Sequence, residues 1–274
     1  MAENQSNRTV PGDGFAGEKN VDVKIMPRPK AWDDIKKPLT APVTAKNPLD
    51  VYLATSFRSP YAYLGMDRYA ALAENYNLKI HVRYIFPIAI REPSFFAKAP
   101  DYRYLYDPHD MQREAEFRGV PYHVDTMGKT WIDPVVTEDV IRVAPKDKQI
   151  HIYRLYRNSA LIQEEHPDKS LAWVQRMFRK IYDGTTYNWP DSMPAVLEEI
   201  GLEAKAIEEK AEANEDKYLA VVENNLKLCH ASGHGGVPNA IFRGEPFWGQ
   251  DRIEQLVWRL KQNGLTERQT PPVD

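Results

Sequence analysis

The sequence has little cysteine: Cys229 is the only one among 274 residues. A single cysteine cannot form an intrachain disulfide, and this usage is typical of a reducing compartment, so we expect a cytoplasmic protein. The chain also lacks any apolar run of about 18 residues, so we expect no membrane-spanning helix. Its first twenty residues are polar and lack the apolar stretch of a secretory signal.

Strong charge of one sign is absent as well. The formal net charge is −3, which argues against a nucleic-acid-binding surface. Glycine-rich phosphate loops of the Gly-x-Gly-x-x-Gly and Walker types do not occur. Hydrophobic residues make up 42% of the chain and charged residues 27%, so a packed core is feasible, in one large domain or two small ones.

The stretch over residues 50–65 combines a short strand, a hydroxyl-rich turn and the start of a helix. Residues 51–54 are apolar strand formers, and residues 55–58 form the turn. Ser59 is typical of a helix N-cap, and Pro60 suits the first helical position. A helix that begins at such a turn directs free backbone N–H groups into it, where they can hold an anion. The stretch therefore predicts an anion site that contains the Ser59 hydroxyl.

The hydrophobic pattern predicts strands near both ends of this region and helices between them. A helix over residues 60–76 and an alternating strand over 78–86 complete a βαβ unit with a right-handed crossover. Pro238 stands directly before a predicted strand, where proline removes a hydrogen-bond donor. The carboxyl-terminal part predicts a hairpin and a helix: strands over 240–243 and 247–248, a tight turn at Gly244–Glu245 and a helix from Asp251.

Residues 92–232 show a helical pattern that prolines interrupt. The predicted helices include 150–163, 169–182, 193–200 and 203–227. Residues 203–216 are nearly all charge and alanine, which favours a solvated helix face. Residues 127–148 have poor periodicity and predict an added loop. Residues 1–47 are rich in proline and glycine, which indicates either a disordered tail or an arm that wraps the body or a second subunit.

Several motifs carry a resemblance to a known family. Residues 59–62, Ser-Pro-Tyr-Ala, follow a strand and a loop, as Cys-Pro-Tyr-Cys does in thioredoxin-fold domains of the DsbA type, but both cysteines are absent. A Ser-Pro-Tyr motif at this place resembles the kappa-class glutathione transferases and the 2-hydroxychromene-2-carboxylate isomerases. Residues 103–115 with 119–121, and residues 236–238 with 247–252, are similar to further motifs of the same group.

The resemblance covers about residues 49–262 and implies a fold class. The fold is α/β, a thioredoxin-like core (βαβ…ββα) with a large all-helical insertion domain. The implied parts are an N-terminal extension at 1–47, a core built from 48–88 and 233–265, a helical insertion domain at 89–232 and a tail at 266–274.

The resemblance also implies a glutathione site. In that group the serine faces the thiol of bound glutathione, which implies that Ser59 stabilises the thiolate. Val237 precedes Pro238, which is a cis-proline in the thioredoxin fold, and the pair offers backbone groups to the tripeptide. Gln250 and Asp251 begin the last helix, whose N-terminus suits the γ-glutamyl carboxylate, while Asp251 pairs with the ammonium. Ser-Pro at a helix start is by itself more often only a cap, but the combination favours glutathione as cofactor.

The implied activity is that of a glutathione-dependent isomerase acting on an aromatic catabolic intermediate, similar to the 2-hydroxychromene-2-carboxylate isomerases. One alternative is a kappa-like glutathione transferase that conjugates or cleaves a hydrophobic aromatic electrophile. Another is a non-catalytic thioredoxin-fold adaptor. A disulfide oxidoreductase is disfavoured because both motif cysteines are missing. The expected partners are a small aromatic substrate and a second copy of the chain in a homodimer, with no nucleic acid and no membrane.

Two further groups of residues carry weaker signals. Some aromatic side chains could line a pocket for a flat substrate, although core packing explains such residues more often: Tyr61, Tyr106 and Trp248. Cys229, His230 and His234 are metal-ligating types that lie close together in the sequence. No fourth ligand is evident, so we expect no metal.

Overall fold

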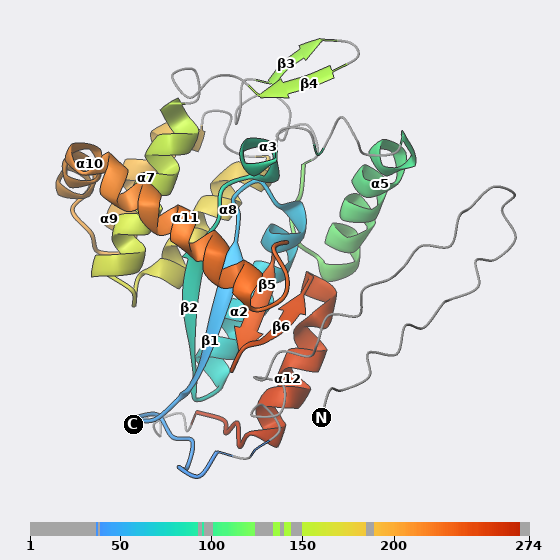
Figure 1. Cartoon of the computed structure of the whole chain (residues 1–274), viewed down its shortest axis with the longest axis vertical. Coiled ribbons are helices and arrows are strands. Elements are labelled where there is room, and N and C mark those ends of the chain that lie inside the picture. Colours follow the sequence, from blue (N-terminus) through green and yellow to red (C-terminus); the bar gives the residue numbers. More distant parts are fainter. Residues whose placement is uncertain are drawn as a thin grey trace, which may run out of the picture.

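The computed structural model describes residues 37, 39–92, 95, 101–123, 134–137, 140–143, 150–184 and 189–268. Most of the arm predicted over residues 1–47, and residues 269–274 of the predicted tail, lie outside this described part. A central sheet carries helices on both faces, and a larger group of helices lies beside it (Figure 1).

The first unit of the sheet is the predicted βαβ unit. It consists of β1 (Leu49–Thr55), α2 (Pro60–Asn75) and β2 (Leu78–Tyr84). The strands β1 and β2 are parallel, with Leu53 opposite Val82 in the register. Val51 and Leu53 are fully buried because they point to the same, covered face of β1, whereas Asp50 and Tyr52 point to the other face and are exposed. The prediction for this part of the chain is confirmed.

The carboxyl-terminal part completes the sheet in the order β2-β1-β5-β6. Its elements are β5 (Asn239–Phe242), β6 (Glu245–Trp248), η3 (Gln250–Arg252) and α12 (Ile253–Gln262). Strand β5 runs antiparallel to both β1 and β6. The last helix was predicted from Asp251, but its first turn is the separate 3₁₀ turn η3 and α12 begins at Ile253. The arrangement βαβ followed by ββα is the thioredoxin-like core that the resemblance implies.

The hairpin turn between β5 and β6 lies one residue earlier than predicted. Its central residues are Arg243 and Gly244, with φ angles of 52° and 87°, whereas Glu245 already pairs with Phe242. A two-residue turn of this kind needs positive φ at both positions, which glycine adopts freely and arginine does not. Arg243 is held there by its guanidinium, which donates to Asn263 Oδ1 at 2.7 Å.

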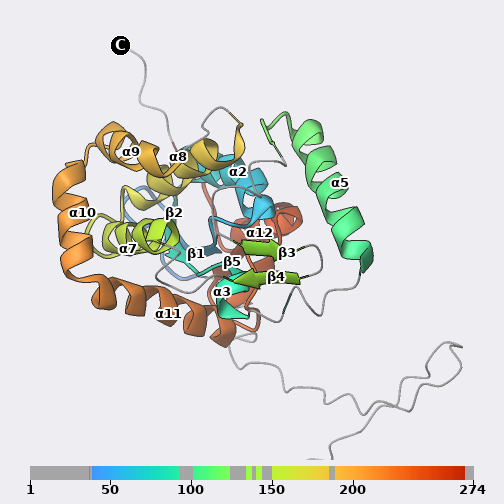
Figure 2. The ribbon, with the colours of Figure 1, turned by 90° about the horizontal axis from the view of Figure 1, so that it is seen from above.

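Helices fill most of the described chain between β2 and β5. They are α3 (Ile88–Arg91), α5 (Asp101–Arg118), α7 (Ile150–Glu165), α8 (Ser170–Tyr182), η2 (Trp189–Ser192), α9 (Met193–Glu199), α10 (Ala204–Ala213) and α11 (Glu215–Ala231). Seen from above, α7 to α11 gather on one side of the sheet and α5 lies on the other (Figure 2). Residues of α11 reach the sheet, where Cys229 packs with Ala54 and Ile85.

Two predictions for this helical part are corrected. The helix predicted over 203–227 is broken at Asn214, whose side-chain amide donates to the Lys210 carbonyl at 2.9 Å and competes with the helical pattern. The loop predicted over 127–148 contains an antiparallel hairpin of β3 (Pro134–Thr137) and β4 (Val140–Val143). Both strands are too short to show a periodicity, although β-branched residues dominate them. The rest of that segment lies outside the described residues.

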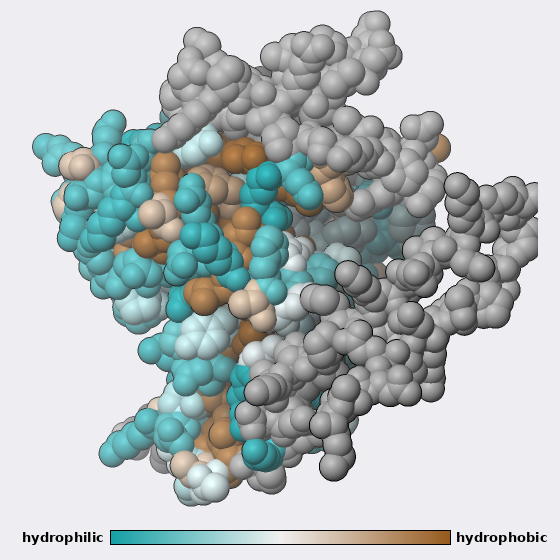
Figure 3. All heavy atoms as spheres, viewed as in Figure 1, coloured by the Kyte–Doolittle hydropathy of each residue, from teal (hydrophilic) through white to brown (hydrophobic). Residues whose placement is uncertain are grey.

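The helices share one apolar core with the sheet. Large aromatic side chains from both parts are fully buried in it, among them Phe57, Tyr84, Tyr156 and Phe178. Along α10, by contrast, only Ala204, Ile207 and Ala211 are buried, and Figure 3 shows the hydrophilic surface over this helix that the sequence predicts. No helix in the described part of the chain is long and apolar enough to cross a membrane.

Candidate active site

Ser59 lies at the start of α2, as predicted. It is half-buried and is the N-cap residue: its Oγ accepts the N–H of Ala62 at 3.3 Å, and buried Pro60 occupies the first helical position. The cap satisfies one of the free N–H groups of the first turn. Ser59 is therefore fixed at the junction of strand and helix, with its hydroxyl hydrogen available to a second partner.

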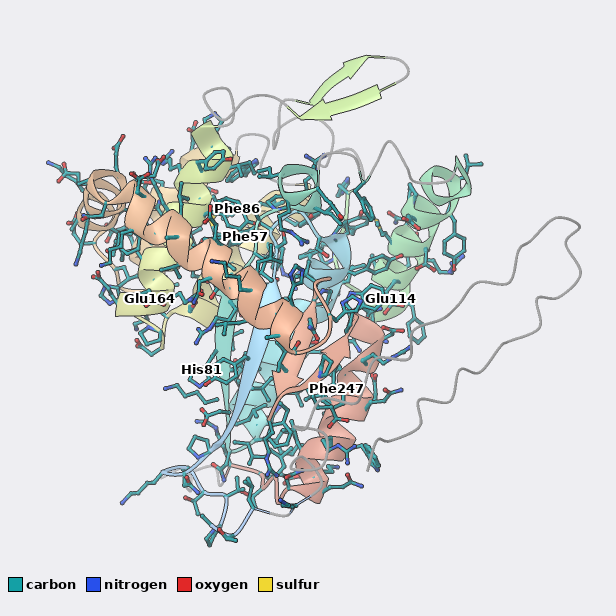
Figure 4. The ribbon with its side chains drawn as sticks, viewed as in Figure 1. Phe57, His81, Phe86, Glu114, Glu164 and Phe247 are labelled. Atoms are coloured by element: carbon teal, nitrogen blue, oxygen red, sulfur yellow. The ribbon has the colours of Figure 1, made fainter. Side chains whose placement is uncertain are left out.

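The turn before Ser59 is held by two tyrosines of the helical part. The N–H of Phe57 donates to the Tyr156 hydroxyl at 3.2 Å, and the Tyr182 hydroxyl donates to the Phe57 carbonyl at 3.0 Å. The Phe57 ring itself lies between Tyr84 and Tyr156, with ring centroids 5.5 and 5.7 Å away. Phe57 and Phe86 lie together at the upper end of β1 and β2 (Figure 4). Sequence reasoning missed this contribution, because the tyrosines lie about a hundred residues away from the turn.

The loop before β5 meets Ser59 directly. The bond between Val237 and Pro238 is cis, as the resemblance implies. The Ser59 hydroxyl donates to the Val237 carbonyl at 3.4 Å, which is a long and weak hydrogen bond. The N–H of Gly249 donates to the Pro238 carbonyl at 2.8 Å, which attaches the segment before η3 to the same loop. The helix start at Ser59 and the loop at Val237, which lie 178 residues apart, thus meet, and the segment before η3 is attached to that loop.

Gln250 and Asp251 follow at once but differ in environment. Gln250 is buried, and its side-chain and backbone oxygens both accept from the guanidinium of Arg68 on α2. Asp251 is exposed, and its carboxylate pairs with the neighbouring Arg252 at 2.6 Å. The structure therefore leaves the Asp251 carboxylate open to solvent, while the Gln250 side chain is already bound. Arg68, which sequence reasoning missed, lies on a helix face that gives no sign of this contact.

Two of the predicted pocket aromatics share one carboxylate. The Tyr61 hydroxyl donates to Asp110 Oδ2 at 2.6 Å, and the Tyr106 hydroxyl donates to Asp110 Oδ1 at 3.1 Å. Arg113 donates to the same carboxylate at 2.5 Å. The Tyr61 bond, followed by the Arg113 bond, lowers the pKa of Asp110, while burial and then Asp110 raise the pKa of Tyr61 far above its usual value. Tyr61 is thus a neutral donor that ties α2 to α5, and Tyr106 is exposed.

The third predicted aromatic, Trp248, is exposed and stacks on a histidine. Its ring lies 4.1 Å from that of His234, centroid to centroid, at an interplanar angle of 24°. His234 Nδ1 accepts the N–H of Gly236 at 2.9 Å, so the imidazole braces the loop before the cis-proline. Burial, and next the neighbouring His230, lower the pKa of His234, which keeps the ring neutral for this role. The sequence placed His234 among metal-ligating types but gave no sign of this contact.

The candidate metal ligands do not form a site. Among the described residues, no group of three or more His, Cys, Asp or Glu side chains is placed to hold a metal ion. The Cys229 thiol is buried and donates to the backbone carbonyl of His234 at 3.0 Å. Burial raises the pKa of this thiol, so it is not a thiolate at neutral pH.

Arg58 is a further residue that sequence reasoning missed. It directly precedes Ser59 and is half-buried, and burial lowers the pKa of its guanidinium. A cation, a helix N-terminus and a hydroxyl donor around one point can stabilise an anion or a thiolate. The backbone beside a cis-proline can add hydrogen bonds to an extended peptide.

Comparisons with known proteins give the family and the fold. A comparison with protein families matches residues 50–261 to the DSBA-like thioredoxin domain. Among solved structures, the fold is similar to 2-hydroxychromene-2-carboxylate isomerase, with a TM-score of 0.56 and 22% identity, over 78% of this chain and 95% of that one. It is also similar to a probable DsbA oxidoreductase from Streptomyces coelicolor, with a TM-score of 0.52 and 14% identity over 82% and 93% of the two chains.

A third similar structure is the cytosolic disulfide reductase DsbM from Pseudomonas aeruginosa with GSH, with a TM-score of 0.51 and 16% identity, over 78% of this chain and all of that one. At these identities the likeness shows the fold alone. No curated protein sequence matches the chain.

Proposed function

The chain belongs to the DsbA-like thioredoxin-domain family, and on that premise we propose that it is a glutathione-dependent enzyme whose Ser59 hydroxyl stabilises the thiolate of the bound tripeptide. The activity we favour is isomerisation of an aromatic catabolic intermediate. The likeness in fold to 2-hydroxychromene-2-carboxylate isomerase, and to a disulfide reductase solved with GSH, supports the choice of chemistry.

The observation that carries the proposal is the contact between Ser59 and the cis-proline loop. The Ser59 hydroxyl donates to the Val237 carbonyl over 3.4 Å, a bond weak enough to be exchanged for one to a ligand sulfur. Within the described residues the N–H of Val237 has no hydrogen-bond partner and its carbonyl holds only this weak bond, so both backbone polar groups of Val237 can pair with an extended ligand. A tripeptide that pairs with Val237 therefore brings its own side chain to Ser59.

The rest of the site fits glutathione in part. Asp251 is exposed beside the loop and carries the charge that a γ-glutamyl ammonium requires. Arg68 already occupies the side-chain oxygen of Gln250, so its amide nitrogen and backbone N–H are the groups that would donate to the γ-glutamyl carboxylate. We infer that Gln250 also fixes the start of η3 against α2, and that Asp251 provides the contact to the ammonium.

When bound, glutathione supplies a thiolate that adds reversibly to a conjugated substrate in isomerisation, or stays attached to an electrophile in conjugation. The chain's part is to favour thiolate over thiol. Ser59 donates a hydrogen bond to the sulfur, and the N-terminus of α2 adds its positive end. A hydrophobic aromatic substrate would lie against the exposed ring of Trp248 and beside Tyr61 and Tyr106, and we propose these three as the substrate contacts.

Calorimetry with glutathione at millimolar concentration tests the binding step. We expect binding by the native protein, and a rise in the pKa of the bound thiol in Ser59→Ala. Ser192→Ala is a matched control, since Ser192 also precedes a helix and its hydroxyl donates to the Trp189 carbonyl at 2.6 Å, outside this site. No binding by the native protein would overturn the proposal.

The alternative is a kappa-like glutathione transferase, and the same site serves it. Mass spectrometry separates the two activities: turnover of an aromatic substrate with catalytic glutathione and no change in mass indicates an isomerase, whereas an accumulating conjugate indicates a transferase. Tight binding without turnover of either kind would favour the adaptor. The homodimer stays a prediction, which sedimentation of the purified protein tests.

A further inference from the structure

Arg58 lies beside Ser59 and has no part in the resemblance or in the motifs around it. Consecutive Cα atoms across a trans peptide are about 3.8 Å apart, so the two residues share one turn. That turn is fixed on both sides of Phe57 by the hydroxyls of Tyr156 and Tyr182. The position of Arg58 is therefore set by the same contacts that set Ser59.

The guanidinium of Arg58 is partly withdrawn from water without a counter-charge. It is half-buried, and within the described part of the chain no carboxylate forms an ion pair or hydrogen bond with it. Six other described arginines are paired with acids: Arg68 with Glu254, Arg113 with Asp110, Arg118 with Glu114, Arg154 with Glu208, Arg157 with Glu215 and Arg179 with Asp67. Arg83 and Arg91 are part-buried and form no ion pair with a described acid, but each donates to a backbone carbonyl, that of Val82 and that of Phe86. A partly buried cation without a partner is costly unless a ligand provides the anion.

The titratable groups on the surrounding elements do not supply that anion. Tyr156 of α7 and Tyr182 of α8 are neutral, because burial raises the pKa of both hydroxyls well above the usual range. Asp110 of α5 is ionised but already accepts from three donors. His234, in the loop before the cis-proline, is neutral and supplies no negative charge. Among the described residues, none of these groups supplies a counter-charge to Arg58.

We propose that Arg58 stabilises, through its charge, the thiolate of glutathione held at Ser59. This inference rests on the proposed function and deepens it, since it assigns a second group to the same sulfur. Ser59 provides a hydrogen bond and Arg58 an electrostatic field, and both favour the charged form over the thiol. Coulombic attraction falls with distance, and in this proposal the sulfur is held by the residue next to Arg58 in the chain.

The test is the pKa of the bound thiol, read from the ultraviolet absorbance of the thiolate as pH is raised in saturating glutathione. In Arg58→Met we expect this pKa to rise by about one, which is a tenfold lower ratio of thiolate to thiol at neutral pH. Arg58→Lys should keep most of the effect, because the charge remains at the same turn. Arg176→Met is the matched control, since it removes a cation from an exposed ion pair between α8 and Glu199 of α9.

The outcomes separate this inference from the proposed function. If the native protein does not bind glutathione, both are wrong. If Arg58→Met binds glutathione with an unchanged thiol pKa, only the role of Arg58 is wrong. The role of Arg58 at the sulfur is also wrong if Arg58→Met keeps the native thiol pKa but no longer prefers an aryl carboxylate substrate over the matching amide. Arg58 would then bind the second substrate. If Arg58→Met does not fold, an equal pKa in Arg58→Gln and the native protein overturns the inference.

Discussion

Replacing Ser59 with alanine removes two hydrogen bonds and so has two separate consequences. The first is loss of the cap: substitution of such a residue costs about 1 kcal/mol of unfolding free energy, and the 3.3 Å distance to Ala62 N–H places this case in the lower half of the range. The second concerns the ligand. A hydrogen bond to a charged group contributes about 1.5–3 kcal/mol, so the pKa of the bound thiol should rise by about one to two.

The two effects are measured separately. Urea unfolding gives the cost of the cap, and thiolate absorbance in saturating glutathione gives the thiol pKa. Ser59→Gly isolates the second effect, because glycine at an N-cap costs only a few tenths of a kcal/mol. Ser59→Thr keeps the hydroxyl and should preserve both properties. The reasoning is refuted if Ser59→Gly binds glutathione with the native thiol pKa, since the hydroxyl would then be no more than a cap.

Three further variants test the supports of the site. The pKa of His234 is below its usual 6.5, so the folded protein favours the neutral ring. Stability and glutathione affinity should therefore fall as the pH drops below 6.5. His234→Phe, which keeps the stack on Trp248, should flatten both pH profiles. Arg68→Met leaves the buried Gln250 oxygen without its donor and should lower the unfolding free energy in urea by about 1–3 kcal/mol. Calorimetry should show weaker glutathione binding. Unchanged binding would show that the start of η3 does not depend on Arg68. Tyr61→Phe removes the largest cause of the low pKa of Asp110, so the pKa of that carboxyl, read by NMR titration, should rise. The unfolding free energy above that pKa should fall by about 1 kcal/mol. An unchanged pKa would contradict the hydrogen bond between Tyr61 and Asp110.

The elements that local chemistry defines could be predicted from the sequence. Ser59 and Pro60 set the start of α2, and the alternation after Leu78 sets β2, because both signals lie within a few neighbouring residues. The hairpin turn was misplaced by one residue because Gly244 marks a turn but does not show whether the other central residue precedes or follows it. Asn214 ends a helix through its own side chain, and a pattern of charge and alanine does not show that.

The supports of the candidate site were beyond sequence reasoning for a different reason. Tyr156 and Tyr182 hold the turn of Ser59 through their hydroxyls, yet each lies on an apolar helix face where core packing is sufficient explanation. His234 contacts Trp248 across the hairpin, and no spacing in the sequence marks that pair. Such contacts depend on how helices and strands meet, so they become visible only in three dimensions.

The single cysteine decides where the reactive sulfur must come from. Thiol–disulfide exchange needs a thiolate that can reach its partner and a second thiol that resolves the mixed disulfide. Cys229 is 1% exposed, its thiol donates to the His234 carbonyl, and burial raises its pKa, so it supplies neither. At the helix start where a DsbA-type domain carries two cysteines, this chain has Ser59 and Ala62. Any thiol chemistry at Ser59 therefore requires a sulfur that arrives with a ligand. The backbone N–H of Val237, which has no partner among the described residues, suits a ligand that is itself a peptide.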